Sequence, residues 1–167
     1  MTEKTAQTHP FPPLYDEGSR VLILGSFPSV KSREQRFFYG HPQNRFWRVL
    51  AAVFDEPVPA SIEEKKSLVL RSRLALWDTI ASCEITGSSD ASITNVVPND
   101  LRPILAAADI RAIFCNGGTS YKWYNRLLRE KLGREAGLLP STSPANARWT
   151  AEALTEAWKQ AILPYLE

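Results

Sequence analysis

Short, nearly continuous apolar runs that each stop at a polar loop constrain this chain more than any other feature. Residues 20–24, Arg-Val-Leu-Ile-Leu, form the first run, which ends at Gly25. Comparable runs cover residues 74–77, 110–115 and 136–139. Such runs are typical of strands that are buried on both faces, and segments with helical spacing separate them. Strands that alternate with helices predict an α/β fold with three layers, α/β/α, around a central, mostly parallel four-stranded sheet.

The helices expected around this sheet follow apolar periodicity and capping signals. They cover residues 46–53, 62–73, 101–108, 119–132 and 151–163. Ser61 and Thr150 are suitable N-caps for the second and the last of these helices, and Asp100 can cap the third. Residues 84–95 are rich in glycine and serine, so we expect them to form a loop.

A chain of 167 residues is expected to form one domain. Residues 1–13 are polar, contain prolines and lack periodicity, so we expect a flexible lead-in, followed by a single domain over residues 14–167. No apolar run approaches the roughly 20 residues that a membrane helix needs, and the N-terminus lacks the apolar region of a signal peptide. We therefore expect a cytoplasmic protein without a membrane partner.

Neither the net charge nor the cysteines points to a particular ligand. Lys and Arg number 20 and Asp and Glu 18, which leaves a net charge of +2. DNA binding would therefore depend on local clusters of basic residues. Cys83 and Cys115 flank no second cysteine or paired histidines, which excludes a four-cysteine zinc or iron–sulfur site built from this chain alone. We expect each to be a buried apolar residue without a disulfide.

Polar loops follow the expected strands, each at the point where a strand ends. They are residues 25–29, Asp78, residues 116–118 and residues 141–146. In an open α/β sheet, the carboxyl ends of the strands line the ligand crevice. We therefore expect these loops to converge on one pocket.

The first of these loops, Gly-Ser-Phe-Pro-Ser at residues 25–29, allows the backbone to approach a ligand at Gly25 and offers the ring of Phe27. The alternative is a tight turn with a core phenylalanine. The loop lacks the glycine spacing of a dinucleotide site and the lysine of a phosphate-binding P-loop, so neither kind of site is supported.

Residues 37–47, Phe-Phe-Tyr-Gly-His-Pro-Gln-Asn-Arg-Phe-Trp, are an unusual sequence for packing alone. Aromatic rings stack on bases, and each contributes about 1–3 kcal/mol in single-strand binding. Asn44 is either a pocket carboxamide or an N-cap of the helix that follows. His41 is equally compatible with a structural hydrogen bond, so we assign it no catalytic role.

Two further loops offer polar groups to a nucleic acid. The carboxamide of Asn116 can read a base edge, although Asn-Gly is equally a turn. Residues 139–146, Leu-Pro-Ser-Thr-Ser-Pro-Ala-Asn, combine hydroxyl groups with two prolines. Such a loop suits phosphate contacts and a wedge into a duplex, or it is simply a loop before a helix cap.

Together these segments resemble the uracil-DNA glycosylase superfamily, and within it the hypoxanthine-DNA glycosylase branch, from about residue 20 to residue 163. The segments that carry the resemblance are Leu-Gly-Ser-Phe-Pro-Ser (24–29), Tyr-Gly-His-Pro-Gln-Asn-Arg-Phe-Trp (39–47), Leu-Trp-Asp (76–78), Gly-Ser-Ser-Asp (87–90), Asn-Asp (99–100), Phe-Cys-Asn-Gly (114–117) and Leu-Pro-Ser-Thr-Ser-Pro-Ala-Asn (139–146). The resemblance implies the superfamily's α/β/α fold, base flipping and hydrolysis without a cofactor or a metal. It also implies a monomer whose partner is DNA containing a deaminated base.

This sequence departs from the better-known uracil branch in the groups that position water. The first motif has Ser26 and Phe27 in place of an Asp or Asn, and the second motif, residues 141–146, has no His. The branch that the chain resembles places the amide on the His-Pro-x-Asn loop. The resemblance therefore makes Asn44 the first catalytic candidate and Asn116 the second.

Three further points follow from the same comparison of motifs. Asp78 and Asp90 are acidic alternatives for positioning the water, or each serves only in capping or loop hydrogen bonds. Residues 84–86, Glu-Ile-Thr, stand where a basic residue is expected, which weakens one local DNA contact. The matched motifs contain no lysine, so we predict no Schiff-base lyase step.

The resemblance assigns two further groups of residues. The substrate-binding candidates are Gly25, Ser26, Phe27, Pro28, Tyr39 and Asp78. The DNA-binding candidates are Ser141, Ser143, Pro144, Ala145, Asn146 and Arg148.

The function that follows is a monofunctional DNA glycosylase for deaminated bases, with hypoxanthine as the preferred base. A uracil or mismatch glycosylase is the first alternative, because amides and backbone groups can bind uracil as well. A non-catalytic nucleic-acid-binding module on the same fold is the second. A small-molecule α/β hydrolase is the least supported, because the chain has no GxSxG nucleophile elbow.

Overall fold

The computed structural model describes residues 3–166 and contains the expected parallel sheet. Its strands are β2 (Val21–Gly25), β3 (Leu74–Asp78), β6 (Ala112–Asn116) and β7 (Gly137–Leu139). They lie in the order β3-β2-β6-β7, and every pairing between them is parallel. β2 and β3 are buried at every residue, which explains their uninterrupted apolar runs. The predicted fold class is confirmed.

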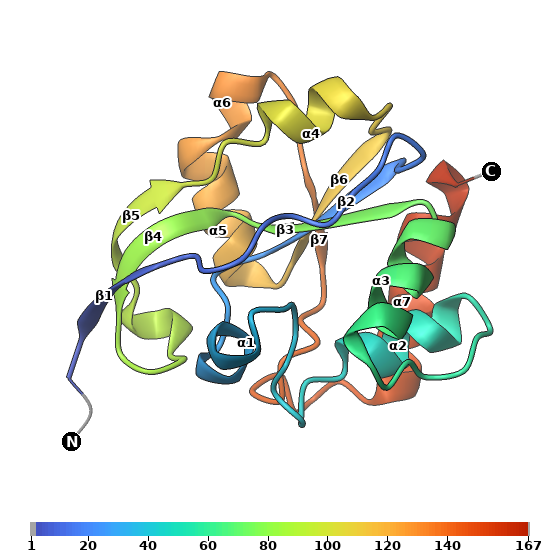
Figure 1. Cartoon of the computed structure of the whole chain (residues 1–167), viewed down its shortest axis with the longest axis horizontal. Helices are drawn as coiled ribbons and strands as arrows, with labels where there is room; N and C mark the ends of the chain where they lie inside the picture. The colour runs from blue at the N-terminus through green and yellow to red at the C-terminus, as the bar shows by residue number, and fades with distance from the viewer. Residues whose placement is uncertain (1–2, 167) are drawn as a thin grey trace.

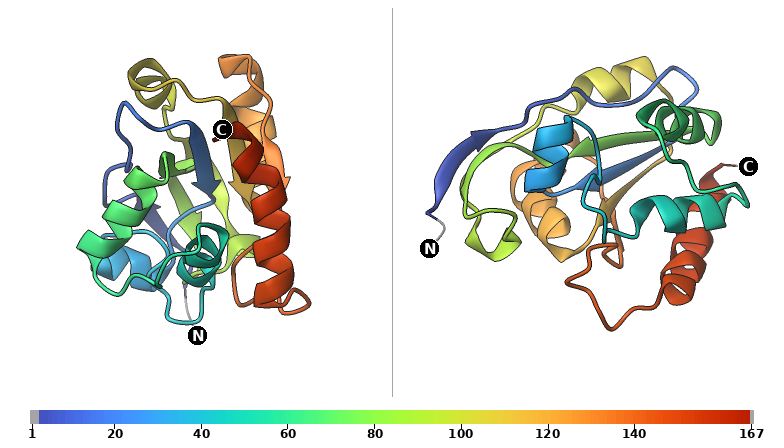
Figure 2. Two further views of the ribbon diagram at one scale, coloured as in Figure 1. Left: turned by 90° about the vertical axis from the view of Figure 1, so that its right-hand side faces the viewer. Right: turned by 60° about the horizontal axis from the view of Figure 1, so that its bottom comes forward.

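Helices cover both faces of this sheet and complete the three layers. They are α1 (Val30–Gln35), α2 (Phe46–Val53), α3 (Ile62–Arg71), α4 (Arg102–Ala107), α5 (Gly118–Leu127), α6 (Arg129–Leu132) and α7 (Ala151–Ile162). In Figure 1, α5 and α6 lie on one side of the sheet, and α2, α3 and α7 lie on the other. Although α2 and α7 are far apart in the sequence, they pack side by side (Figure 2).

The predicted helices occur at the predicted positions, but some of their bounds differ. Residues 119–132 form two helices, because the chain breaks at Leu128, where φ is −121° and ψ is −33°. α1 was not predicted, since its six residues are too few to show a period. None of the helices within residues 3–166 combines the length and the apolar character that crossing a membrane requires.

A second, antiparallel sheet was not predicted. It consists of β1 (Thr5–Thr8), β4 (Ile80–Ile85) and β5 (Thr94–Pro98), in the order β1-β4-β5. β4 follows β3 after a single residue, Thr79, so the chain passes almost directly from one sheet into the other (Figure 1). The prediction of a loop over residues 84–95 is wrong at both ends, where the chain is in β4 and β5. Ile85 and Ile93 are buried in a second apolar cluster that tertiary packing alone creates.

The N-terminal prediction is also wrong for the residues that the structure describes. Instead of a flexible lead-in over residues 1–13, Thr5–Thr8 pair with β4, from Thr5 opposite Ile85 to Thr8 opposite Ser82. Phe11 then enters the main core. Backbone pairing holds this edge strand, and its side chains remain largely exposed, so its sequence carries no apolar pattern. Residues 1 and 2 lie outside the described residues.

Both cysteines are buried and free, as expected. The main core lies between the parallel sheet and the helices and includes Trp158 of α7 and Tyr124 of α5. The second cluster joins Phe27 to Ile80, Cys83, Ile85 and Ile93. The loop that carries Phe27 is thereby packed against the second sheet.

Candidate active site

A pocket of about 490 Å³ opens at the carboxyl ends of the parallel strands. Every residue predicted to act in catalysis or substrate binding lines it, namely Gly25, Ser26, Phe27, Pro28, Tyr39, Asn44, Asp78 and Asn116. Of the predicted DNA-binding residues, Ser141, Ser143, Pro144 and Ala145 line the same pocket. Asn146 lines an adjoining groove, and Arg148 is exposed and lines neither.

Gly25 creates the space in which the floor of the pocket is built. A Cβ atom at this position would lie 2.4 Å from Asp78 Oδ1 and 3.2 Å from Tyr39 Oη. Any side chain at residue 25 would therefore displace the carboxylate of Asp78. The glycine is required for close approach, as the sequence suggested, and the group that approaches is a carboxylate.

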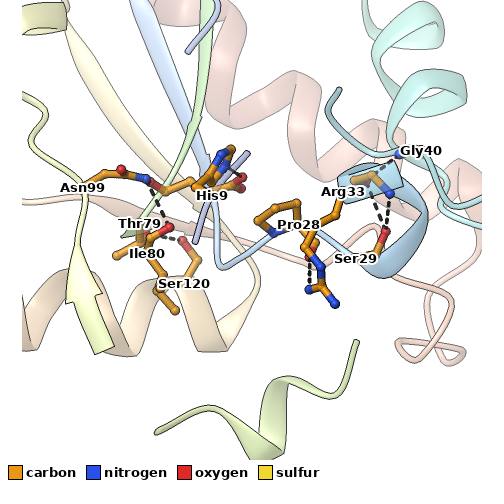
Figure 3. Close-up of polar contacts among 11 residues, drawn as sticks. His9, Pro28, Ser29, Arg33, Gly40, Thr79, Ile80, Asn99 and Ser120 are labelled. Carbon is orange, nitrogen blue, oxygen red and sulfur yellow. Dashed lines mark hydrogen bonds and ion pairs between the residues drawn. The ribbon is translucent and has the colours of Figure 1, made fainter. Parts of the chain in front are cut away.

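Asp78 ends β3 and is held by a residue that the sequence analysis did not single out. Its Oδ2 lies 2.6 Å from Nε2 of His9, and the two side chains are 7% and 3% exposed. The backbone carbonyl of Asp78 accepts a hydrogen bond from Asn99 Nδ2 at 2.8 Å. Asn99 also donates to Ile80 O at 3.2 Å, which secures the passage from β3 to β4 (Figure 3). No spacing in the sequence links His9 to Asp78.

Tyr39 forms part of the same floor and is a neutral phenol. Its ring stacks on Phe46 with centroids 3.9 Å apart and planes at 12°, so one of its faces is already occupied. Burial raises the pKa of Tyr39 well above its usual range, and the negative charge of Asp78 raises it further. The backbone of Tyr39 is left-handed, with φ of 52°, which turns the ring into the core. Tyr39 can therefore offer a base its hydroxyl or one remaining face.

Asn116 is engaged by the protein itself. Its Nδ2 donates to Thr142 Oγ1 at 3.0 Å and to Tyr39 Oη at 3.3 Å, and its Oδ1 accepts from Thr142 N at 3.1 Å. Both amide hydrogens thus have partners, which leaves one lone pair on the oxygen. The side chain ties the end of β6 to the loop after β7. This geometry disfavours Asn116 as the group that reads the base or holds the water.

Asn44, unlike Asn116, makes a hydrogen bond through only one end of its carboxamide. Its Oδ1 accepts from the N–H of Phe46, the first residue of α2, at 2.9 Å, although the N-cap position itself is held by Arg45. Its Nδ2 has no hydrogen-bond partner among residues 3–166, and the residue lines the pocket. The oxygen of the carboxamide therefore binds the first N–H of α2, the residue lines the pocket, and its catalytic role stays a prediction.

Phe27 combines a packing role with a place in the pocket wall. The residue is 7% exposed and belongs to the second apolar cluster. The guanidinium carbon of Arg33 lies 5.6 Å from its ring centroid. Arg33 donates to Pro28 O at 2.9 Å (Figure 3). It also donates to Gly87 O at 3.1 Å. The ring is therefore fixed before any ligand arrives.

Asp90 faces Ser26 at the rim of the pocket. Ser26 Oγ donates to Asp90 Oδ1 at 3.1 Å. Although the Asp90 side chain reaches solvent, the surrounding protein desolvates its carboxyl group and raises its pKa. The charge of Asp78 also raises this pKa, while hydrogen bonds from Ser26 and Thr119 lower it. The rim is thus an unfavourable place for a further negative charge.

The loop after β7 is shaped by its own side chains. Ser141 Oγ accepts from Ser143 N at 3.1 Å, and Ser143 Oγ accepts from Ala145 N at 3.2 Å. Asn146 Nδ2 donates to Ser141 O at 3.0 Å. The two hydroxyl groups keep their hydrogens for an outside acceptor such as a phosphate, whereas the Asn146 amide is used within the loop. Pro144 and Ala145 are exposed.

Arg45 holds this loop from the neighbouring segment, and the sequence analysis missed that role. Its Nη2 donates to Ser143 O and Asn146 O, both at 3.0 Å, and its Nη1 donates to Trp149 O. The backbone N–H of Arg45 also donates to Thr142 O at 3.0 Å. The only signal in the sequence was the position of Arg45 beside Asn44.

No group of three or more His, Cys, Asp or Glu side chains that could hold a metal ion occurs in the part of the chain that the structure describes. The polar side chains of the pocket are carboxamides, hydroxyls, the imidazole of His41 and the two carboxylates of Asp78 and Asp90. Such groups suit hydrogen bonding to a base and a water molecule.

Comparison with known proteins identifies the family to which this chain belongs. A family model of the uracil DNA glycosylase superfamily matches residues 12–167. The chain belongs to this superfamily. The hypoxanthine DNA glycosylase of Methanosarcina acetivorans is 34% identical over 147 residues, which cover 87% of this chain and 92% of the relative. That of Methanosarcina barkeri is 31% identical over 154 residues, which cover 91% of this chain and 96% of the relative.

A solved structure supports the same family assignment. The solution NMR structure of a proposed uracil DNA glycosylase from Methanosarcina acetivorans has a TM-score of 0.80 with this chain, at 32% identity. The match covers 97% of this chain and 99% of that chain. In this member of the uracil DNA glycosylase superfamily, the first strand loop supplies space at Gly25 and the ring of Phe27. The carboxamide and the carboxylate of the pocket come from other segments, at Asn44 and Asp78.

Proposed function

We propose that this chain is a monofunctional DNA glycosylase that hydrolyses the N-glycosidic bond of deoxyinosine in DNA and releases hypoxanthine for base-excision repair. The observation that carries the proposal is the joint presence in one pocket of a fixed aromatic wall, a buried carboxylate and a free carboxamide hydrogen-bond donor. The two Methanosarcina relatives, both hypoxanthine DNA glycosylases by name, support the choice of base. We further expect the protein to act as a cytoplasmic monomer.

The base must leave the duplex before it can enter such a pocket. Extrusion costs a few kcal/mol and costs least for a poorly paired base. Hypoxanthine opposite a mismatched partner pairs weakly, which gives selectivity before any contact with the pocket forms. Phe27 would then stack on the flipped base, with the remaining face or the hydroxyl of Tyr39 beside it.

Asp78 would read the ring of the base. Hypoxanthine carries a hydrogen on N1, whereas adenine has a bare acceptor there. The Oδ1 atom of Asp78, which lies against Gly25, can accept the N1 hydrogen of hypoxanthine and would repel the lone pair of adenine. A carboxylate acceptor at this position therefore favours hypoxanthine over adenine, the base from which deamination produces it.

Asn44 would orient the water. Cleavage breaks the bond between the sugar C1′ and the purine nitrogen, the electron pair leaves with the purine, and a water oxygen adds to C1′ and loses a proton. An amide is too weak a base to remove that proton early, but it can fix the position of the water. Backbone N–H groups of the loop at residues 25–27 would stabilise the departing purine anion. The loop at residues 141–146, with Arg148, would hold the DNA backbone.

Uracil is the second candidate substrate, and a specific observation favours it. Uracil also carries a ring N–H, at N3, which the Asp78 carboxylate can accept equally well. The proposed uracil DNA glycosylase among the solved structures is consistent with this choice.

A single-turnover panel tests the proposal. Duplex oligonucleotides that contain hypoxanthine, uracil, xanthine or unmodified adenine are incubated with excess protein, and alkali reveals the abasic sites. We expect hypoxanthine to be released fastest and adenine to remain intact. Fastest release of uracil would select the second candidate. Tight binding to abasic DNA without release of any base would identify a binding module instead.

A further inference from the structure

His9 occupies a setting that the pocket chemistry described so far does not explain. Its side chain is 3% exposed, and its Nε2 lies 2.6 Å from Asp78 Oδ2. The rings of Phe11 and Trp77 lie 4.4 Å from its own, centroid to centroid. Its Nδ1 is buried and has no hydrogen-bond partner among residues 3–166. The imidazole therefore makes one polar contact, and that contact is Asp78.

A buried nitrogen without a hydrogen-bond partner destabilises the folded state, so the position of His9 lowers the free energy of unfolding. A neutral imidazole has one N–H and one bare nitrogen. We assign the hydrogen to Nε2, because the carboxylate of Asp78 can only accept. This assignment leaves Nδ1 as a bare nitrogen among aromatic rings, where a second N–H without an acceptor would cost more.

The contact determines which way the Asp78 carboxylate faces. With Oδ2 bound to His9, the other oxygen, Oδ1, lies against Gly25 at the pocket floor. Asp78 also loses the freedom to rotate about its last bond. A pocket acceptor is thus preorganised by a residue that does not itself line the pocket.

The N-terminal segment delivers His9 to this place. β1 pairs with β4 from Thr5 to Thr8, and the backbone N–H of His9 then donates to Ala81 O at 2.8 Å. These bonds set His9 beside the start of β4, close to Thr79 and Ile80 (Figure 3). The N-terminal segment, which the sequence predicted to be a flexible lead-in, therefore contributes to the site.

We propose that His9 is a positioning residue for base recognition, which acts by holding the Asp78 carboxylate so that Oδ1 accepts the ring N–H of the flipped base. The proposal rests on the proposed function, because it assigns the base-reading group of the same pocket. It extends that function by placing a specificity determinant on the N-terminal segment, outside the pocket wall.

Binding to two DNA duplexes tests this role in the full-length protein. One duplex carries 2′-fluoro-deoxyinosine, which resists cleavage and presents the base, and the other carries a tetrahydrofuran abasic site, which presents none. His9→Phe keeps a packed ring but removes the donor. We expect it to weaken binding to the inosine duplex about 10- to 100-fold and to leave binding to the abasic duplex within about threefold.

His9→Gln is the conservative rescue, because its Nε2 can occupy the place of the imidazole Nε2. We expect it to recover most of the binding to the inosine duplex. Equal weakening on both duplexes by a folded His9→Phe variant, or no weakening on either, would overturn the proposal. Should His9→Phe not fold, the comparison between His9→Asn, whose amide is one methylene too short to reach Asp78, and His9→Gln decides in the same way.

Failure of the proposed role of His9 can be distinguished from failure of the proposed function. If the wild-type protein releases hypoxanthine and the position 9 variants bind both duplexes as it does, only the role of His9 is lost. If the wild-type protein releases no hypoxanthine in the single-turnover panel, the proposed function itself fails.

Discussion

Asn44 shows how one side chain can satisfy two interpretations of a sequence. Its Oδ1 accepts from Phe46 N at the start of α2, while its Nδ2 has no hydrogen-bond partner among residues 3–166, and the residue lines the pocket. The capping signal and the catalytic candidate were alternatives when only the sequence was considered. The geometry makes them compatible, since the oxygen and the nitrogen of a carboxamide point in different directions and can bind different groups.

A substitution series at Asn44 separates capping from catalysis. Asn44→Ser keeps a capping oxygen but loses the carboxamide, so we expect excision of hypoxanthine to fall at least about 100-fold while stability changes little. Asn44→Ala should lose the same activity and also about 1 kcal/mol of unfolding free energy. Single-turnover kinetics and thermal unfolding measure the two effects. Near-wild-type excision by the serine variant would mean that Asn44 is a helix cap and nothing more.

Asp90 gives a pH-dependent prediction with a definite sign. Desolvation raises its pKa above the usual 3.8, so the fold disfavours its charged form, and the destabilisation is present above the folded-state pKa. It vanishes once the pH falls below 3.8, where Asp90 is protonated in both the folded and the unfolded chain. Asp90→Asn should therefore raise the melting temperature at pH 7.5, and the gain should shrink toward pH 4.

The control for Asp90 is Glu130→Gln, on the exposed side of α6. It removes one carboxylate without relieving a buried charge, so its effect on melting temperature should be small at both pH values. A fall in the melting temperature of Asp90→Asn at pH 7.5 would contradict the expected sign.

At the scale of elements, apolar runs, apolar periodicity and capping residues were enough to predict the strands and most helices of the main layers. β2 and β3 were recognisable because burial on both faces requires an unbroken apolar run. β1 and β5 were not, because most of their side chains are exposed and their stability comes from backbone pairing with β4. An edge strand of this kind leaves no trace in hydrophobic periodicity.

The contact between α2 and the loop after β7 leads to a prediction about Arg45. Its guanidinium donates to the carbonyls of Ser143, Asn146 and Trp149. Arg45→Ala should lower the free energy of unfolding by about 1.5–3 kcal/mol and speed amide hydrogen exchange over residues 143–149. DNA binding should weaken with the loss of loop order.

Arg48→Ala is the matched control for Arg45, because it removes the same charge from an exposed position on α2, three residues further along the chain. It should leave exchange in residues 143–149 unchanged. Equal exchange in the two variants would show that the loop is held by other contacts.

At the scale of the whole molecule, the balance of charge limits how the protein can bind DNA. A net charge of +2 provides little long-range attraction. We propose that residues 3–166 act as one domain, in which the N-terminal strand is a structural part. Affinity must then come mainly from the pocket, the loop at residues 141–146 and a few phosphate contacts.

The salt dependence of DNA binding measures those contacts. We expect a shallow slope of log K against log salt, of about −2 to −4, because each phosphate contact contributes about −0.9. Arg148→Ala should reduce the slope by about one, since Arg148 is exposed next to the loop at residues 141–146, which we propose binds DNA. Arg129→Ala, on α6 at the end of the molecule opposite α1 (Figure 1), should not change it. An unchanged slope in Arg148→Ala would remove that residue from the interface.

The sequence by itself determined the layers of the fold and the edge of the sheet at which the site lies. Buried strands have a recognisable pattern, and the ends of parallel strands necessarily meet, so Gly25, Asp78 and Asn116 could be placed together. Only the tertiary structure decided which polar groups are free. His9 reaches Asp78 across 69 residues, and Arg45 reaches Asn146 across 101. Asn116 is occupied by Thr142, which leaves Asn44 as the available carboxamide. Hydrogen bonds between distant residues follow from the packing of the whole chain and have no periodic signature along it.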